Sequence, residues 1–169
     1  MRKLKEKPLL TFVYDTREQR PYRLAIPDPR YFDDGGGYDE KLEAGDIGCD
    51  LDGQRQTVVV ERKALQDFVA CCGRERERFE NELARLSAYG MAVIVIEAPF
   101  AQIRAVANPP SMTGRPGMSG DQCWRSIIHW QVVYPTVHWY CATNRTEGRM
   151  ATQRYLEEFC RHRMTIEEL

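Results

Sequence analysis

The sequence has no long apolar segment. No run of residues approaches the roughly 18 apolar positions that a membrane-spanning helix requires. The charged start "MRKLKEKP" is not followed by the apolar core of a signal peptide. We therefore expect a cytoplasmic protein, or a nuclear one in a eukaryote, that has no membrane partner. Its 169 residues, 43% hydrophobic and 29% charged, are expected to form a single globular domain.

The six cysteines lack the spacing of metal ligands or of a disulfide framework. There is no CxxC pair, and no cysteine and histidine stand at the separations found in zinc sites. Cys71 and Cys72 are adjacent within a helical pattern, and the other four cysteines are isolated along the chain. Disulfides are rare in the cytosol and nucleus. We therefore expect reduced thiols, most of them buried.

The chain also has no excess of either charge. Its 24 basic and 25 acidic residues give a formal net charge of −1, which argues against a protein that coats nucleic acid through charge alone. A local basic groove is compatible with this balance. Lysine is scarce, and beyond Lys41 the only lysine is Lys63, which lies in the stretch "TVVVERKALQDF".

The hydrophobic pattern predicts an α/β fold. The strand-like segments, of which the second and third are joined by an Asp52-Gly53 turn signal, cover residues 9–15, 42–51, 55–63, 91–99 and 136–142. Helical patterns, the first bent at Gly73, cover residues 64–88, 119–135 and 144–163. The order β-β-β-α-β-α-β-α predicts a mixed sheet covered by helices on both faces, a three-layer α/β/α arrangement. The stretch "ANPPSMTGRPGMSG" predicts a mobile loop at about residues 107–120.

The charged end of the third strand is the first indication of a function. Side chains alternate along a strand, so Glu61 and Lys63 should project from one face of the sheet and Arg62 from the other. The hairpin should return Asp46 close to Glu61. A divalent cation would relieve the repulsion between these two carboxylates, and Mg²⁺ prefers such oxygen ligands. Water activated there beside Lys63 could attack a phosphodiester. The alternative is a surface ion pair between Glu61 and Lys63.

The helix "RERERFENELARLSAY" gives a second indication. At about 100° per residue, Phe79, Leu83 and Leu86 form its core stripe. On one flank of this stripe the same spacing gathers three arginines, Arg74, Arg78 and Arg85. Such a row could follow the phosphates of a DNA strand. The alternative is a solvated helix with Glu–Arg pairs.

Several motifs occur together in the order of a known family. The stretches "YDTREQRPY", "LEAGDIGCDL", "VVVERKALQDFVACCGR" and "VIVIEAP" resemble the nuclease domain of the XPF-type structure-specific endonucleases, a branch of the PD-(D/E)XK superfamily. The resemblance covers about residues 9–163. It implies a restriction-endonuclease-like core and a nuclease domain over the whole chain.

The resemblance also implies a role for individual residues. Asp46 and Glu61 would hold the metal, with the Arg62 carbonyl as a further ligand, and Lys63 would orient or activate water. Asp15 and Glu18 would complete the acidic site or orient it from outside. The implied catalytic set is therefore Asp15, Glu18, Asp46, Glu61, Arg62 and Lys63. Phosphate or DNA contacts fall to Arg17, Arg74 and Arg78, whereas Asp67 would brace a helix and Glu97 would be structural.

The implied activity is that of a magnesium-dependent endodeoxyribonuclease, with Mn²⁺ able to substitute and one or two metals per site. Its substrate would be branched DNA, such as a flap, fork or junction, in repair or recombination. XPF-type enzymes usually carry helix-hairpin-helix modules, and some carry a helicase domain. We expect a free-standing domain, in a prokaryotic or viral setting, that recognises branches as a homodimer or through a separate DNA-binding partner. The alternative function is a catalytically silent DNA-binding or dimerisation subunit of a nuclease complex.

Overall fold

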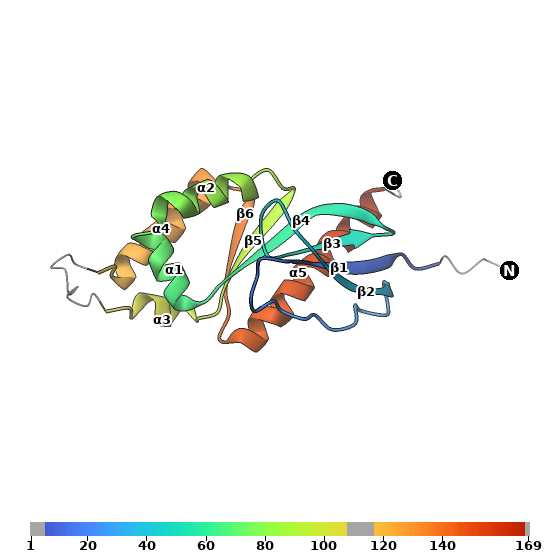
Figure 1. The fold of residues 1–169 in the computed structure, drawn as a ribbon, viewed down its shortest axis with the longest axis horizontal. Coiled ribbons are helices and arrows are strands. Elements are labelled where there is room, and N and C mark those ends of the chain that lie inside the picture. The colour runs from blue at the N-terminus through green and yellow to red at the C-terminus, as the bar shows by residue number, and fades with distance from the viewer. Residues whose placement is uncertain (1–5, 108–116, 168–169) are drawn as a thin grey trace.

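The computed structural model describes residues 6–107 and 117–167. One six-stranded sheet, in the spatial order β2-β1-β3-β4-β5-β6, runs through the molecule (Figure 1). The strands are β1 (Leu9–Asp15), β2 (Asp33–Glu40), β3 (Ile47–Leu51), β4 (Gln54–Lys63), β5 (Met91–Ile96) and β6 (Val137–Cys141). The sheet is mixed because β3 pairs antiparallel with β1 and β4, whereas the other neighbours are parallel.

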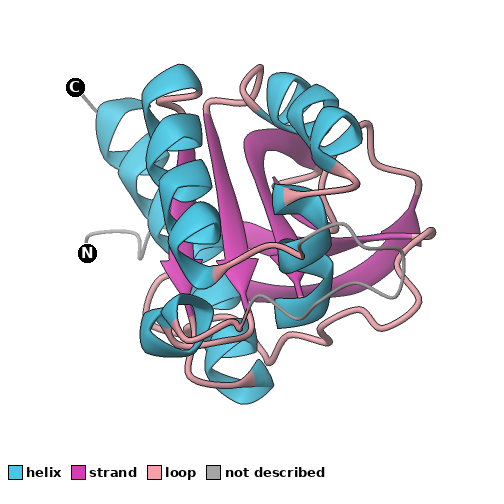
Figure 2. Ribbon diagram, turned by 90° about the vertical axis from the view of Figure 1, so that its left-hand side faces the viewer, coloured by secondary structure: helices cyan, strands magenta, loops and turns pink. Residues whose placement is uncertain are grey.

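Helices cover the sheet on both faces (Figure 2). They are α1 (Leu65–Cys72), α2 (Arg76–Leu86), α3 (Phe100–Arg104), α4 (Gly120–Val133) and α5 (Arg145–Glu167). The helices α1, α2 and α4 share one hydrophobic core with Val59 and Ile94 of the sheet. The helix α5 contributes Leu156 to a second core with Val58 and Val60. Since β4 alternates between the two cores, the predicted three-layer α/β/α arrangement is confirmed.

Most local predictions are confirmed. The helical pattern of residues 64–88 is interrupted at Gly73, which separates α1 from α2. The helix predicted from residue 119 begins there as α4, where Ser119 and Gln122 form a capping box. Asn144 accepts the Glu147 N–H at 3.0 Å where α5 begins. All six cysteines are free thiols, and Cys141 is the one that is not fully buried. Among the described helices, none is long and apolar enough to cross a membrane.

No strand was predicted over residues 33–40, between β1 and β3. The segment "DDGGGYDE" forms β2, an edge strand that pairs in parallel with β1 although most of its residues are exposed. Polar residues and glycines carry no strand pattern. Backbone pairing holds this edge, together with side-chain bonds such as that from the Tyr38 hydroxyl to Asp50 at 2.6 Å. The short helix α3 was not predicted either. The predicted mobile loop at about residues 107–120 lies mostly outside the described residues, because 108–116 are not described.

Gly45 joins this scaffold to the functional residues that follow. Its φ of +79° suits glycine, and a Cβ built there would stand 2.3 Å from Val59 Cγ2 of β4. The turn therefore needs both a positive φ and a close approach to the sheet. Only glycine provides the two together, and the residue that it places is Asp46.

We predict that Gly45→Ala lowers the free energy of unfolding by about 2 kcal/mol or more, since it adds a clash to the backbone strain. Gly53→Ala is the matched control, because Gly53 has a φ of +76° and a Cβ added there would meet no atom within 4 Å. Gly53→Ala should lower the free energy of unfolding only through backbone strain, by about 1 kcal/mol. Urea unfolding measures both, and equal losses would contradict the steric explanation.

Candidate active site

Asp46 is fixed at the point where β3 and β4 meet. Its N–H donates to the Val60 carbonyl at 2.8 Å, and its own carbonyl accepts the Asp15 N–H at 2.8 Å. Its Oδ2 accepts the Arg62 N–H at 2.7 Å. Three backbone contacts to two neighbouring strands thus orient the Asp46 carboxylate, as the predicted hairpin requires.

Glu61 and Lys63 project from the face of β4 that α2 covers, as their spacing predicts. The Lys63 ammonium donates to Glu61 Oε1 and lies 3.4 Å from Glu82 Oε2 of α2. It also stands 5.3 Å from the centre of the Phe79 ring. Glu61 is 5% exposed. The ion pair of the alternative is therefore present, but both partners are largely enclosed rather than exposed at the surface.

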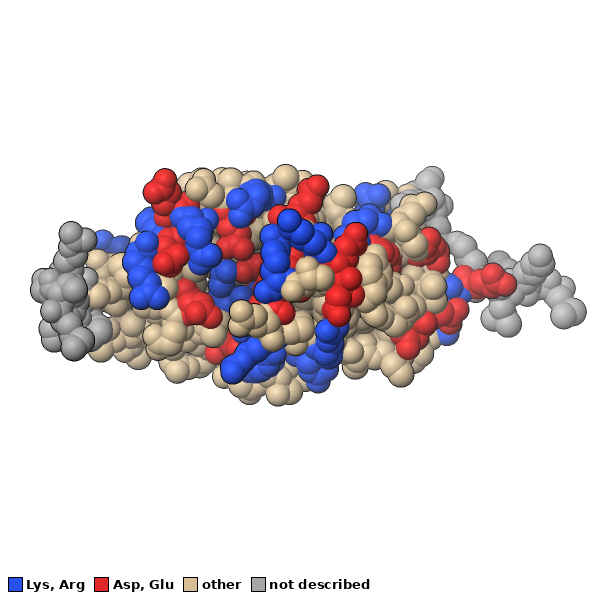
Figure 3. Space-filling model, viewed as in Figure 1, with Lys and Arg blue, Asp and Glu red and all other residues tan. Residues whose placement is uncertain are grey.

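A cavity of about 370 Å³ opens over these residues. Its wall includes seven residues of the expected site, namely Asp15, Arg17, Glu18, Asp46, Glu61, Lys63 and Arg78. Glu82 and Arg85 of α2 line it as well. Acidic and basic side chains alternate on the face shown in Figure 3, so no field of one sign surrounds the cavity. We call it the acidic cavity.

The acidic cavity carries more negative than positive groups. Six carboxylates and four cationic side chains line it. Burial, followed by the charge of Asp46, raises the pKa of Glu61 well above its usual value. Burial also raises the pKa of Asp46, to about 7, and Glu18 adds to the effect. The charge of Lys63 lowers the pKa of both carboxyls but does not offset their burial.

These residues fit a divalent cation. Within residues 6–107 and 117–167, no group of three or more His, Cys, Asp or Glu side chains is arranged to hold a metal. Magnesium, however, commonly binds through one or two carboxylates and keeps several waters. The N–H and carbonyl of a strand residue point to the same side, so the Arg62 carbonyl is directed towards Asp46, as its N–H is. Two carboxylates and one peptide oxygen are therefore available.

Lys63 is held in its charged form. Burial by itself would lower the pKa of the ammonium, but the carboxylates of Glu61 and Glu82 outweigh burial and raise it. Glu82 was not predicted as a site residue. Its spacing of four from Arg78 and three from Arg85 places it on their side of α2, and this was the available signal.

Asp15 braces the site from its rim. Its carboxylate accepts the Arg17 N–H at 2.6 Å, the Arg17 Nη2 at 2.6 Å and the Leu42 N–H at 2.9 Å. Burial alone would raise the pKa of Asp15, but these bonds lower it. Of the two roles expected for Asp15, the bonds favour orienting the segment that leads to Asp46. Arg17 is 55% exposed beyond this contact.

The Arg62 side chain lies on the opposite face, as the alternation predicts. Its guanidinium is 12% exposed and pairs with Glu18 at 3.1 Å and Glu97 at 3.3 Å. Glu97 also accepts from the Tyr22 hydroxyl at 2.7 Å and from Arg145 at 2.9 Å. The guanidinium therefore ties the segment after β1 to β5 and α5. The structure brings the backbone of Arg62 to the acidic cavity, but not its charge.

Two of the three arginines expected to contact DNA, Arg74 and Arg78, differ in position. Arg78 lines the acidic cavity, is 74% exposed and pairs with Glu75 at 2.9 Å. Arg74 does not line it, is 81% exposed and lies 3.7 Å from the same Glu75. Of these two, Arg78 is thus the one placed to meet a ligand of the cavity.

Comparisons with known proteins bear on the fold. No family model and no curated protein matches the sequence. A solved structure of XPF from Aeropyrum pernix is similar, with a TM-score of 0.61 and 18% identity, over 94% of this chain and 69% of that chain. XPF from Aeropyrum pernix in complex with DNA gives a TM-score of 0.56 and 17% identity, over 92% of this chain and 66% of that chain. The chain thus spans about two thirds of these structures, and the predicted XPF-type, restriction-endonuclease-like fold is confirmed.

We predict that Arg62→Ala lowers the free energy of unfolding by about 3 kcal/mol, because it leaves Glu18 without its ion pair in an enclosed position. Arg74→Ala is the matched control and should change stability by less than about 0.5 kcal/mol. Urea unfolding at neutral pH measures both. Similar small effects for the two variants would mean that the Arg62 network contributes little.

We predict that Asp46→Asn stabilises the metal-free protein at pH 8, by about 1–2 kcal/mol. A carboxyl whose pKa is higher in the folded than in the unfolded state loses stability as the pH rises from about 4 through the folded pKa. The amide avoids this loss and can still accept the Arg62 N–H. The gain should vanish below about pH 4, where native Asp46 is protonated in both states. Thermal unfolding from pH 3 to 8 measures it, and a pH-independent difference would contradict the cause.

Proposed function

We propose that this chain is a magnesium-dependent endonuclease that hydrolyses phosphodiester bonds in DNA. The observation that carries the proposal is the meeting of Asp46, Glu61 and Lys63 in one cavity at the end of β3 and β4. The fold shared with XPF from Aeropyrum pernix supports it. A structural subunit would have little use for two largely enclosed carboxylates whose pKa is raised by burial.

Asp46, Glu61 and the Arg62 carbonyl are the groups that would hold the metal. When bound, Mg²⁺ supplies positive charge that polarises the phosphoryl group and makes water a better nucleophile. Mn²⁺ takes the same oxygen ligands and should substitute. Glu18 and Asp15 support the site, the first from the cavity wall and the second through Arg17 and Leu42.

Lys63 acts as a charged hydrogen-bond donor in this proposal. Glu61 and Glu82 raise the pKa of its ammonium in the metal-free site, which favours the charged form. It can orient the attacking water and stabilise the charge that develops on the phosphoryl oxygens. The carboxylate of Glu82 keeps it in place while Glu61 serves the cation.

DNA is the proposed substrate, and Arg17 and Arg78 at the rim are the proposed phosphate contacts. The complex of XPF from Aeropyrum pernix with DNA supports this choice. We further propose branched DNA, such as a flap, fork or junction, in repair or recombination. A homodimer or a separate partner would supply branch recognition.

We predict that the native protein cuts end-labelled flap or fork DNA with Mg²⁺, and that Glu61→Gln lowers the rate at least about a hundredfold, because a carboxylate that holds the cation is lost. Chelation with EDTA should stop cleavage, and Mn²⁺ should restore it. Glu77→Gln, an exposed change on α2, is the matched control and should cut at the native rate.

Equal cleavage by native protein and Glu61→Gln would mean that the site is elsewhere. If the native protein retards branched DNA in a gel but cuts none of the substrates, the chain is instead a catalytically silent DNA-binding subunit.

A further inference from the structure

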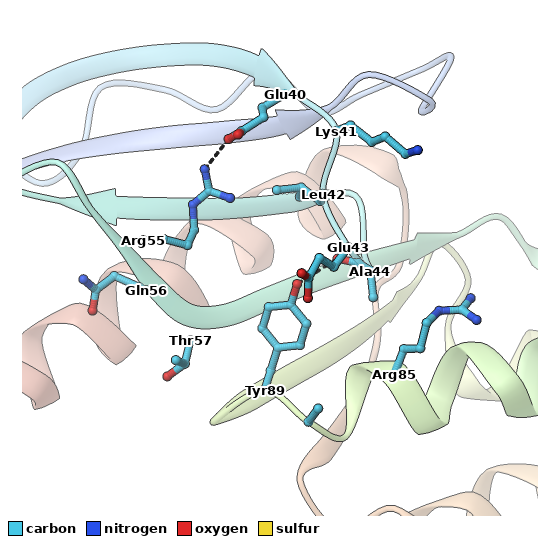
Figure 4. A pocket seen from close by; sticks show the side chains of 11 residues that line it. Glu40, Lys41, Leu42, Glu43, Ala44, Arg55, Gln56, Thr57, Arg85 and Tyr89 are labelled. Atoms are coloured by element: carbon cyan, nitrogen blue, oxygen red, sulfur yellow. Dashed lines mark hydrogen bonds and ion pairs between the residues drawn. The ribbon is translucent and has the colours of Figure 1, made fainter.

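A second cavity, of about 660 Å³, adjoins the acidic cavity. The two share Glu43, Ala44 and Arg85 in their walls. The second is also lined by Lys41, Arg55 and Tyr89 (Figure 4). Its size falls in the range of about 300–1,000 Å³ that is usual for ligand pockets. We call it the flanking cavity, and the proposed function leaves it without a role.

The two cavities lie end to end along β4. Thr57 of β4 lines the flanking cavity, and Glu61 of the same strand lines the acidic cavity. The two residues are four positions apart, a distance of roughly 13 Å at about 3.3 Å per residue. Because the cavities share the wall formed by Glu43, Ala44 and Arg85, a DNA strand whose scissile phosphate lay at Glu61 would continue past Arg85 into the flanking cavity.

The flanking cavity differs from the acidic cavity in charge. Within the described part of the chain, Arg85 and Lys41 form no ion pair. Arg55 pairs with Glu40 and, at 2.6 Å, with Asp50, so those acidic groups are neutralised. Two unpaired cations, against the single unpaired carboxylate of Glu43, thus face this end of the groove within the described residues, and Arg85 stands where the two cavities meet. An anionic group crossing from one cavity to the other would meet Arg85 first.

Tyr89 gives the flanking cavity an aromatic wall. It follows the end of α2, and its ring stands beside the Glu43-Ala44 segment (Figure 4). Its hydroxyl lies 3.5 Å from the Ala44 carbonyl and its ring packs on the core, so the ring is held in position. A fixed tyrosine ring accepts any base that has left its stack, because every base has a π-face.

We propose that the flanking cavity binds the nucleotide next to the scissile phosphate, with its base against Tyr89 and its phosphate at Arg85. The inference rests on the proposed nuclease function and specifies its substrate. A base that is stacked and paired within a duplex cannot meet the Tyr89 ring. The favoured substrate is therefore a DNA strand that has an unpaired or easily extruded base beside the bond that is cut.

The test compares two flap substrates that differ in one nucleotide. The cut position is first mapped with native protein, and an abasic residue is then placed immediately 5′ or immediately 3′ of that bond. Tyr89→Ala should raise KM about tenfold on the intact flap, through loss of base stacking. On the flap that is abasic at the bound position, native protein and Tyr89→Ala should have equal KM. Tyr89→Phe keeps the ring and should behave as native on both.

Arg85→Ala should raise KM on intact and abasic flaps alike, because the phosphate is present in both. Arg149→Ala is the matched control, since Arg149 lines a different cavity away from this groove. The affinity of each variant for the intact flap is measured by fluorescence anisotropy with Ca²⁺ in place of Mg²⁺. It should fall for Tyr89→Ala and Arg85→Ala and stay native for Tyr89→Phe and Arg149→Ala. A variant that folds poorly would bind both flaps more weakly. Tyr89→Ala is expected to differ from native protein on the intact flap alone.

The outcomes separate this inference from the proposed function. If native protein cuts the flap but Tyr89→Ala has the same penalty on intact and abasic flaps, or none, the flanking cavity does not bind the base and the nuclease function stands. If native protein neither binds nor cuts the flap while it is folded, both proposals are wrong.

Discussion

The hydrogen bond from the Arg62 N–H to the Asp46 carboxylate is the contact on which the candidate site depends. It fastens the residue before β3 to the end of β4, and so holds Asp46 and Glu61 at one end of the sheet. Burial and repulsion oppose this arrangement, since they raise the pKa of both carboxyls. The backbone bonds of Asp46 to Val60 and Asp15 supply the opposing constraint. The fold thus maintains an electrostatically unfavourable arrangement, which is the usual signature of a site that acts on a ligand.

The two faces of β4 present side chains with different roles. On one face, Glu61 and Lys63 line the acidic cavity under α2. On the other, the Arg62 guanidinium joins Glu18 and Glu97, and through Glu97 it reaches α5. The charged end of an apolar strand is tolerated because every one of its three charges has partners. None of them is simply solvated, as a strand end at the surface would be.

The amino-acid sequence was sufficient to predict the layers, the hairpin and the two-faced charged triplet. Each of these follows from local periodicity, because alternation along β4 assigns Glu61 and Arg62 to opposite faces. The sequence was insufficient to predict features that depend on backbone pairing between strands or on packing between distant segments. The strand β2 is built from glycines and acidic residues and has no strand pattern. Glu82 and Tyr89 belong to the cavities because α2 packs over β4. The spacing of Glu82 places it on the arginine side of α2, but no local pattern reports the packing of that side on β4.

Arg62 contributes its main chain to one face and its side chain to the other. Every amino acid except proline offers the same peptide N–H and carbonyl, so the contact with Asp46 does not depend on which side chain stands at this position. The network around Glu97 does depend on it. Substitutions at residue 62 would therefore change the stability of the domain while leaving Asp46 and Glu61 in place. At this one position, the side chain determines stability and the main chain determines the geometry of the candidate site.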